Sequence, residues 1–134
     1  MGIFEKSVVG IEFDSTEIRA IHLKGTPGKP RLVTYGRMQL QEGAVKDGKV
    51  QSPWLLSEAI SNMWEKYGIK CRNVILGINN QDIIVRFAAF PKVPEDKIDN
   101  MIRFQSENYI PIPIEETELD YAVLGEDISV APLQ

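Results

Sequence analysis

Two prolines separated by a single isoleucine, Pro111 and Pro113, constrain the fold of this chain more than any other feature. Each proline removes a backbone donor and pushes the residue before it into an extended conformation, so residues 109–114 cannot form a helix. The isoleucines of this stretch still need apolar cover. We therefore expect an extended apolar arm that either closes the core of its own domain or lines a groove for a partner.

Charge and cysteine content narrow the classes of function. The 15 basic and 19 acidic side chains give a net charge of -4, which argues against a surface that binds nucleic acid. Cys71 is the only cysteine, so the chain cannot form an internal disulfide and suits a reducing compartment. No segment approaches the ~20 apolar residues that span a bilayer, and residues 1–10 do not resemble a signal peptide. We expect a cytoplasmic chain without direct membrane insertion.

Three strand-like segments open the chain. Residues 7–13, 17–24 and 31–40 are rich in β-branched and other apolar residues, and turn-forming residues separate them. A polar connection with two glycines follows at residues 41–51. We place a domain boundary after residue 42.

A helix and a hairpin are predicted next. Ser52 is a candidate N-cap with Pro53 at the first helical position, and apolar residues then recur at helical spacing until Gly68. Two β-rich runs, residues 73–78 and 81–90, are separated by a pair of asparagines that suits a tight turn. These two runs should pair antiparallel.

The last part of the chain predicts one more helix and one more strand. Acidic residues follow Pro94 and begin an apolar helical pattern that should end near Asn108. After the proline arm, residues 117–124 alternate between apolar and polar side chains, which predicts a strand. Residues 126–134 form a tail without a clear element. The fold class predicted from these elements is α+β.

Two segments resemble a known family. Residues 105–116, QSENYIPIPIEE, are similar to the E-x-Y-I-P-F-P-x-[DE]-E stretch of PilM proteins of type IV pilus assembly, and residues 119–121 also fit that family. Residues 9–19, VGIEFDSTEIR, resemble the first strand and turn of actin-like ATPases. The resemblance covers nearly all of residues 7–125.

The resemblance implies an actin-like architecture related to FtsA. Residues 1–42 would be the opening strands of an incomplete nucleotide-binding subdomain, a partial first lobe. Residues 43–125 would be a small inserted α+β interaction subdomain, built of helix, hairpin, helix and strand, with residues 126–134 as a tail. In the family, the rest of the first lobe and a second lobe follow, and they carry the second phosphate loop and the adenosine contacts.

The resemblance also locates a degenerate phosphate loop. The superfamily pattern Asp-x-Gly-Ser/Thr falls on Glu12, Phe13, Asp14 and Ser15, with Thr16 next. Asp14 adds a side chain and a negative charge where phosphate oxygens would lie, which opposes nucleotide binding. A plain hairpin turn is the preferred interpretation of these residues. We expect no cofactor for this chain, whereas ATP and magnesium stay possible in a full-length relative.

A partner follows from the same resemblance. PilM proteins bind the cytoplasmic N-terminal segment of the inner-membrane protein PilN between the two subdomains represented here. Because the extended arm can form one wall of a groove beside the end of the second helix, we expect the partner to bind at Arg103, Asn108, Tyr109, Ile110, Pro111, Ile112 and Pro113. The implied function is that of a non-catalytic cytoplasmic adaptor, held peripherally at the inner membrane by its partner. The alternatives are an actin-like ATPase fragment that needs a missing lobe, or an FtsA-like cell-division module.

The remaining candidates have simpler interpretations. His22, the single histidine, has no catalytic partner in any motif and is expected on a strand surface. The acidic residues at 115, 116 and 118 suggest a solvated face, so no metal site is expected. Three opening strands without the rest of their sheet would leave an unpaired edge, which favours a homodimer.

Overall fold

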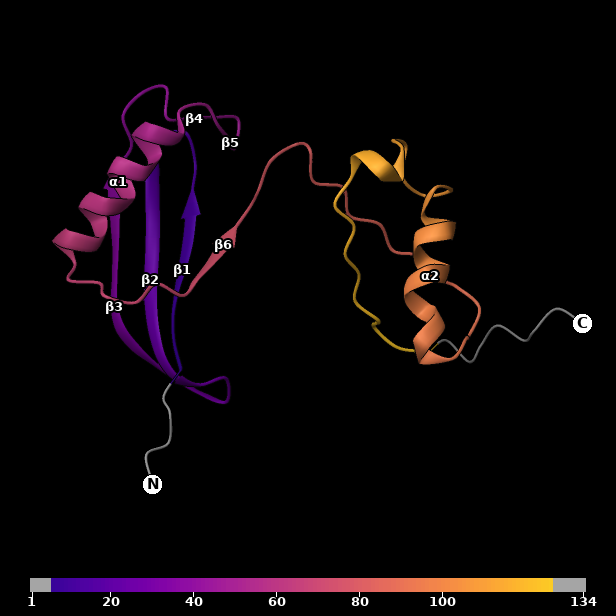
Figure 1. Cartoon of the computed structure of the whole chain (residues 1–134). Coiled ribbons are helices and arrows are strands. Elements are labelled where there is room, and N and C mark those ends of the chain that lie inside the picture. The colour runs from indigo at the N-terminus through magenta and orange to yellow at the C-terminus, as the bar shows by residue number, and fades with distance from the viewer. Residues whose placement is uncertain (1–5, 127–134) are drawn as a thin grey trace, which may run out of the picture. The chain divides into compact units, whose positions relative to one another are not determined.

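The computed structural model describes residues 6–126 and divides into two compact units, Met1–Ile83 and Ile84–Gln134 (Figure 1). We treat each unit by itself. The predicted α+β class is confirmed, because both strands and helices are present. None of the helices in the described part of the chain is long and apolar enough to cross a membrane.

The first unit opens with the predicted meander of three antiparallel strands. These strands are β1 (Lys6–Phe13), β2 (Glu17–Thr26) and β3 (Lys29–Gln39). In the β1–β2 ladder, Val9 lies opposite His22 and Ile11 lies opposite Ala20. Successive side chains of a strand point to opposite faces, so these four residues share one face of the sheet.

A short hairpin and a helix follow the meander. The hairpin consists of β4 (Val45–Lys46) and β5 (Lys49–Val50). The helix α1 (Pro53–Lys66) begins as predicted, since the Ser52 side chain accepts a hydrogen bond from the Leu55 backbone N–H and proline occupies the first turn. Gly68 adopts a positive φ of 63° just beyond the helix, which confirms the predicted end.

The strand after α1 corrects the predicted hairpin. Strand β6 (Val74–Gly77) pairs parallel with β1, so the sheet order is β3-β2-β1-β6. The second half of the predicted hairpin, residues 81–90, forms no strand. The physical reason is that β1 pairs with β2 along one edge only. Helix α1 returns the chain to the other edge of β1, where residues 74–77 form the parallel ladder.

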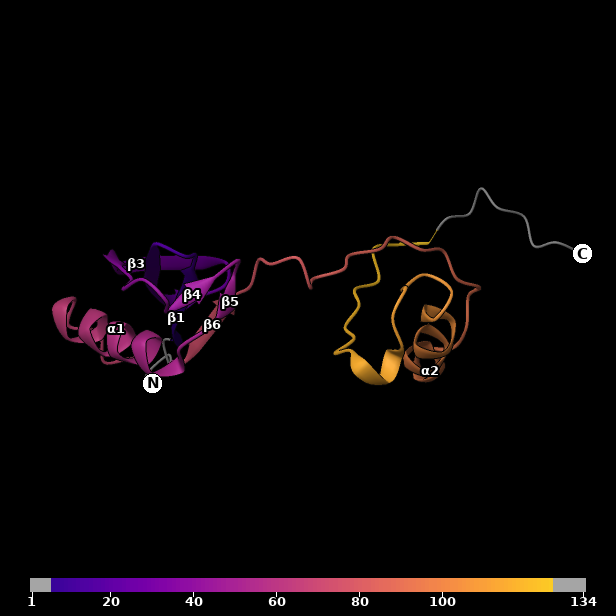
Figure 2. The same cartoon turned by 90° about the horizontal axis from the view of Figure 1, so that it is seen from above.

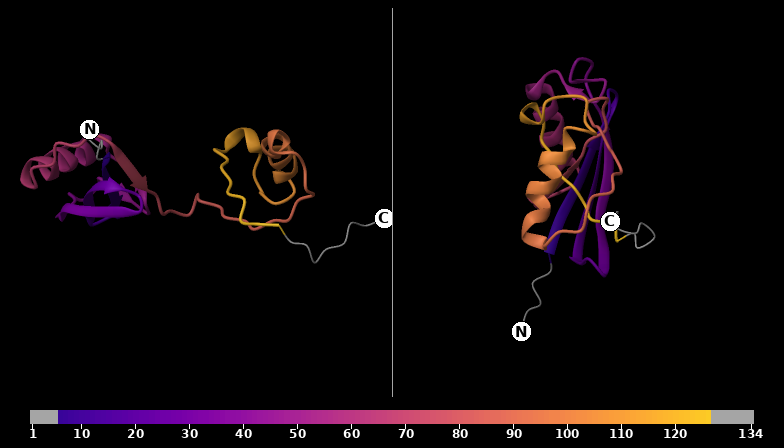
Figure 3. Two further views of the ribbon diagram at one scale, coloured as in Figure 1. Left: turned by 90° about the horizontal axis from the view of Figure 1, so that it is seen from below. Right: turned by 90° about the vertical axis from the view of Figure 1, so that its right-hand side faces the viewer.

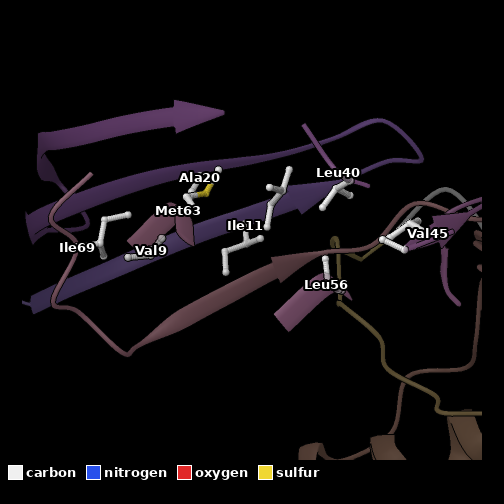
Figure 4. Packing of buried hydrophobic residues seen from close by; sticks show 10 residues of the cluster. Val9, Ile11, Ala20, Leu40, Val45, Leu56, Met63 and Ile69 are labelled. Atoms are coloured by element: carbon white, nitrogen blue, oxygen red, sulfur yellow. The ribbon is translucent and has the colours of Figure 1, made fainter. Parts of the chain in front are cut away.

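The core of the first unit lies between α1 and one face of the sheet (Figure 2). Ile18, Met63 and Val9 are its largest fully buried side chains. Figure 4 shows Met63 and Leu56 of α1 together with Val9, Ile11 and Ala20 of the sheet. Burial of such side chains contributes about 1.5–3 kcal/mol each, so this cluster accounts for much of the stability of the unit.

The second unit contains α2 (Glu95–Ser106) and a short 3-10 helix, η1 (Ile114–Glu116). The prediction of a helix that ends near Asn108 is confirmed. Figure 3 shows α2 with extended segments before and after it. Residues 117–124 form no strand, so the predicted last strand is wrong. A strand needs a hydrogen-bonded neighbour, and no strand is assigned among residues 84–126.

The division into units differs from the predicted boundary after residue 42. Helix α1 packs Leu56 and Met63 into the core of the opening strands, and β6 joins their sheet. Both elements therefore belong to the first unit, which extends to Ile83. Of the predicted tail, all but Glu126 lies outside the described residues.

Candidate functional site

The loop between β1 and β2 is a turn held by Asp14. One carboxylate oxygen, Oδ1, accepts hydrogen bonds from the backbone N–H groups of Thr16 at 2.8 Å and Glu17 at 3.0 Å. The same oxygen accepts a bond from the Thr16 hydroxyl at 2.8 Å. A short acidic side chain bonded to the backbone two residues later is an ordinary turn device. The hydrogen-bond donors of this loop, the two backbone N–H groups and the Thr16 hydroxyl, are thus already bonded to Asp14.

Arg19 joins this turn to three carboxylates. Its guanidinium lies 2.9 Å from Asp14 Oδ2, 2.7 Å from Glu17 Oε1 and 3.7 Å from Glu12 Oε1. The hydrogen bond from Arg19, followed by those from Thr16 and Glu17, holds the pKa of the Asp14 carboxyl well below its usual range. The same bond to Asp14 raises the pKa of Arg19. With three negative charges and one positive charge, the cluster carries a net charge of -2.

Two separate hollows divide the residues of the predicted phosphate loop. Glu12 lines a hollow of about 790 Å³, whereas Ser15 and Thr16 line another of about 760 Å³. The first hollow is lined by Tyr35, Ile21, Gly10 and Ile75, which lie in one cross-strand row, and also by Tyr67 at the end of α1. The four predicted loop residues therefore do not converge on one cavity.

The electrostatics of this loop oppose a phosphate. A phosphate in a loop is held by free backbone N–H groups, and here the N–H groups of Thr16 and Glu17 are already bonded to Asp14. The negative cluster around Arg19 adds repulsion, since like charges 4 Å apart interact by about 4 kcal/mol near a protein surface. A phosphate would have to displace Asp14 before it could contact the loop.

His22 corrects a prediction. The side chain is buried, with only 6% of its surface exposed, and lies on the core face of β2 rather than on a strand surface. Its Nε2 atom lies 2.6 Å from the Ser7 hydroxyl oxygen. This bond satisfies a buried polar ring, as burial of such groups requires.

The start of the proline arm is fixed to the end of α2. The backbone N–H groups of Tyr109 and Ile110 both donate to the Ser106 carbonyl at 2.9 Å. The Tyr109 ring packs edge-on against Phe90, with 5.7 Å between ring centroids. The arm therefore leaves the helix in a defined direction.

The middle of the arm is exposed. Pro113 has an extended backbone, with φ of -57° and ψ of 134°, which confirms that this stretch is not helical. Ile112 keeps 42% of its surface accessible, whereas Ile110 and Ile114 on either side are half-buried. Ile112 is thus an apolar side chain that the core of the second unit does not absorb.

The two polar residues predicted beside the arm differ in their surroundings. Arg103 Nε donates to Asp99 Oδ2 at 2.9 Å, one helical turn earlier, and this bond raises the pKa of Arg103. Asn108 is exposed at the end of α2, and its backbone N–H donates to the Gln105 carbonyl. Arg103 is therefore available to a ligand only as part of a half-exposed ion pair, whereas the side-chain amide of Asn108 is exposed to solvent.

Two aromatic residues that the sequence did not single out are also exposed. Phe104 on α2 is 81% exposed and Phe87 in the preceding extended segment is 82% exposed. The helical spacing could have indicated the exposure of Phe104, because this residue does not share the helix face of Ile98 and Ile102. Large exposed aromatic side chains are enriched in protein interfaces.

Metal-ligating residues do not gather in the part of the chain that the structure describes. Among residues 6–126, no group of three or more His, Cys, Asp or Glu side chains could hold a metal ion.

Comparisons with known proteins show similarity in sequence and in structure. The sequence profile of a family described as "Type IV pilus assembly protein PilM" matches residues 10–132. A solved structure described as "PilM-PilN type IV pilus biogenesis complex" is similar with a TM-score of 0.71 and 26% identity. The match covers 81% of this chain and 32% of the other, so this chain spans about a third of the length of that relative.

Two further solved structures are similar over a smaller part. Both are described as Aquifex aeolicus proteins of the PPX-GPPA type, and each match covers 54% of this chain. Their identities are 18% and 14%, their TM-scores 0.36 and 0.32, and the covered shares of their chains 26% and 25%. These scores are too low to support an inference.

Proposed function

Because the chain belongs to the PilM family of type IV pilus assembly proteins, we propose that it acts as a non-catalytic adaptor that captures a peptide of an inner-membrane pilus protein. The solved relative with a TM-score of 0.71 is a complex of PilM with PilN, so a PilN-like protein is the proposed partner. The ligand would be the N-terminal cytoplasmic segment of that partner. The adaptor would thereby be held peripherally at the cytoplasmic face of the inner membrane.

The proline arm is the observation that carries this proposal. Ile112 is exposed in a segment whose start is fixed by Tyr109 and Ile110, so it presents an apolar side chain from a positioned backbone. The two prolines leave no N–H at positions 111 and 113, whereas the carbonyl groups there can still accept hydrogen bonds. An extended peptide is recognised by such backbone acceptors together with pockets for alternate side chains.

The charge cluster at the first loop supports the non-catalytic part of the proposal. A net charge of -2 around Arg19, with Asp14 bonded to the loop N–H groups, disfavours the alternative of a nucleotide hydrolase. The FtsA-like alternative has no observation in its favour among the described residues. The adaptor proposal needs no chemistry from these groups.

The experiment uses two aspartate substitutions in the second unit. Ile112→Asp places a charge on the exposed arm, and Val123→Asp places the same charge on a residue that is 66% exposed outside the arm. A synthetic peptide with the N-terminal cytoplasmic sequence of the PilN-like partner is titrated against each variant by calorimetry. We expect Ile112→Asp to weaken binding at least tenfold, as truncation of an interface anchor does, with Val123→Asp close to wild type.

Thermal unfolding of the same variants separates binding from stability. Both variants should unfold within a few degrees of wild type, because neither position is buried. If Ile112→Asp stays folded and binds the peptide as tightly as wild type, the arm is not the binding surface. If wild type itself does not bind, the adaptor proposal fails.

Self-association is a second proposed interaction. The described sheet ends at β3 on one side and at β6 on the other, so both outer strands present unpaired backbone groups among residues 6–126. Such edges invite pairing with a second chain. We propose that two copies pair through this sheet.

A further inference from the structure

The β4–β5 hairpin is rigidly attached to the first unit. Ala44 and Val45 at its base are buried in the core. The Ala44 carbonyl accepts hydrogen bonds from the N–H groups of Gln51 and Ser52, which closes the base of the hairpin. At its tip, Asp47 and Gly48 both have positive φ values, 54° and 74°. This Asp-Gly pair is the preferred sequence for a tight two-residue hairpin turn.

The tip of this hairpin contacts the segment that leaves the first unit. Asn80 Nδ2 donates to the Gly48 carbonyl at 3.5 Å, and Lys49 Nζ lies 2.5 Å from Asp82 Oδ2. A β-carbon at position 48 would overlap the Asn79 carbonyl oxygen and Asn80 Cβ, so Gly48 allows the two backbones to approach. Three neighbouring contacts thus join residues 48–49 to residues 79–82.

The exit segment is itself folded into a turn. The Asp82 N–H donates to Asn80 Oδ1 at 2.9 Å, and the Ile83 N–H donates to the Asn80 carbonyl at 3.2 Å. Asn80 therefore holds this turn with its side-chain oxygen and contacts the hairpin with its side-chain nitrogen. The boundary of the first unit falls directly after this turn, at Ile83.

We infer that the β4–β5 hairpin is a clasp that sets where the connection between the two units begins. With the clasp closed, residues 79–82 are held by the first unit and the chain is free only beyond Ile83. With the clasp open, the free chain begins after β6 ends at Gly77. The connection then gains residues 78–83, which add up to roughly 20 Å of reach.

The contacts that close the clasp are few and exposed to solvent. Lys49 and Asp82 keep 42% and 64% of their side-chain surfaces exposed, so their ion pair alone contributes little and weakens in salt. Local segments held by a few exposed contacts open far more often than the core of a domain. The hairpin base does not share this property, because Ala44 and Val45 are buried.

Hydrogen exchange of the full chain tests the clasp from both sides. Lys49→Ala changes the hairpin only, so its effect is read at the N–H groups of Asp82 and Ile83. Asn80→Ala removes both the bond to the Gly48 carbonyl and the bond from the Asp82 N–H, and its effect on the hairpin is read at the Lys49 N–H, which lies in the β4–β5 ladder. We expect exchange on the opposite side to speed up about fivefold in each variant, while exchange in β1 and β2 stays unchanged. Lys46→Ala is the matched control, since it removes the same charge from the same hairpin and Lys46 has no side-chain hydrogen bond or ion pair within residues 6–126.

Distances between spin labels on α1 and α2 test the consequence for the connection. The distribution should broaden in the Lys49→Ala, Asn80→Ala double variant and keep its wild-type width in Lys46→Ala. Exchange at Asp82 and Ile83 that is the same in Lys49→Ala and Lys46→Ala would overturn the clasp. A double variant with faster exchange but an unchanged distance distribution would overturn its role in the connection.

Discussion

The ring of Tyr67 lies directly against Gly36, in the space that the β-carbon of any larger residue at position 36 would occupy. The Tyr67 hydroxyl also donates to the Arg37 carbonyl at 3.1 Å. The residue that caps the end of α1 is therefore packed onto the edge strand β3. This contact fixes the helix against the strand of the meander farthest from β6.

Gly36→Ala should destabilise the first unit by about 1–3 kcal/mol, because the added methyl group overlaps the Tyr67 ring and the packed core yields only partly. Chemical denaturation measures the free energy of unfolding. Gly28→Ala is the control, since a β-carbon there has no heavy atom within 4 Å. Tyr67→Ala should cost less in the Gly36→Ala background than in wild type. Equal stability of the two alanine variants would contradict the proposed contact.

The chain should show no specific binding of magnesium-ATP. The loop N–H groups are bonded to Asp14, and the cluster around Arg19 is negative. Asp14→Gly should not restore binding either, because Glu12 and Glu17 still outnumber the positive charge of Arg19. Calorimetry checks both proteins. A stoichiometric complex of micromolar affinity would contradict this prediction and favour the ATPase alternative.

The stability gap between wild type and Asp14→Asn should depend on pH. The folded state lowers the pKa of Asp14 from its ordinary value of 3.8, so the ionised carboxylate stabilises the fold above that pH. As the pH falls below this value, the unfolded chain takes up the proton first and the contribution is lost. The melting temperature of wild type should therefore exceed that of Asp14→Asn at pH 7, and the two should converge towards pH 2. A gap of the same size at pH 7 and pH 2 would show that the charge of Asp14 does not stabilise the turn.

A dimer should form through β6 rather than β3. Strand β6 exposes Val74, Ile75 and Leu76 without a charged residue, whereas β3 carries Lys29 and Arg37, charges of the kind that blunt an edge. Light scattering should show a concentration-dependent dimer. Ile75→Lys should shift the protein to monomer, and Leu32→Lys on β3 should not. A strict monomer across a wide concentration range would exclude this mode of association.

Local signals predicted the elements that depend on neighbours in sequence. The cap at Ser52, the end at Gly68 and the non-helical stretch at Pro113 all follow from backbone chemistry within a few residues, and the structure confirms each. The opening meander follows from short turns between β-rich runs. Such features require no knowledge of distant partners.

The pairing of β6 was missed because it is not local. A pair of asparagines after residue 78 favours a hairpin with the next run, although the residues before residue 74 form a helix. A strand that follows a helix usually returns parallel to its sheet, and this rule would have favoured the observed pairing. Residues 84–90 have strand-like composition, but propensity without a partner does not make a strand.

The candidate site was also only partly predictable. The alternation of Ile18, Ala20 and His22 along β2 could have placed the histidine on the buried face. The charge cluster could not be predicted in the same way, because Glu12 meets Arg19 only through the cross-strand register. The exposure of Ile112 likewise depends on how the second unit packs.

The parallel pairing of β1 with β6 sets an order for folding during synthesis. Strand β1 leaves the ribosome before α1 and β6 and becomes an inner strand of the sheet, but Val9 meets Val74 only after the chain has been made past α1. Until then the meander carries the apolar side chains of Val9, Ile11 and Ile18 without the cover of Met63. Such a nascent sheet with an open edge is a binding site for chaperones and a risk for aggregation. Substitutions that slow the formation of α1 but leave the finished fold stable should therefore still lower the yield of native protein, because the apolar face of the strands stays exposed for longer.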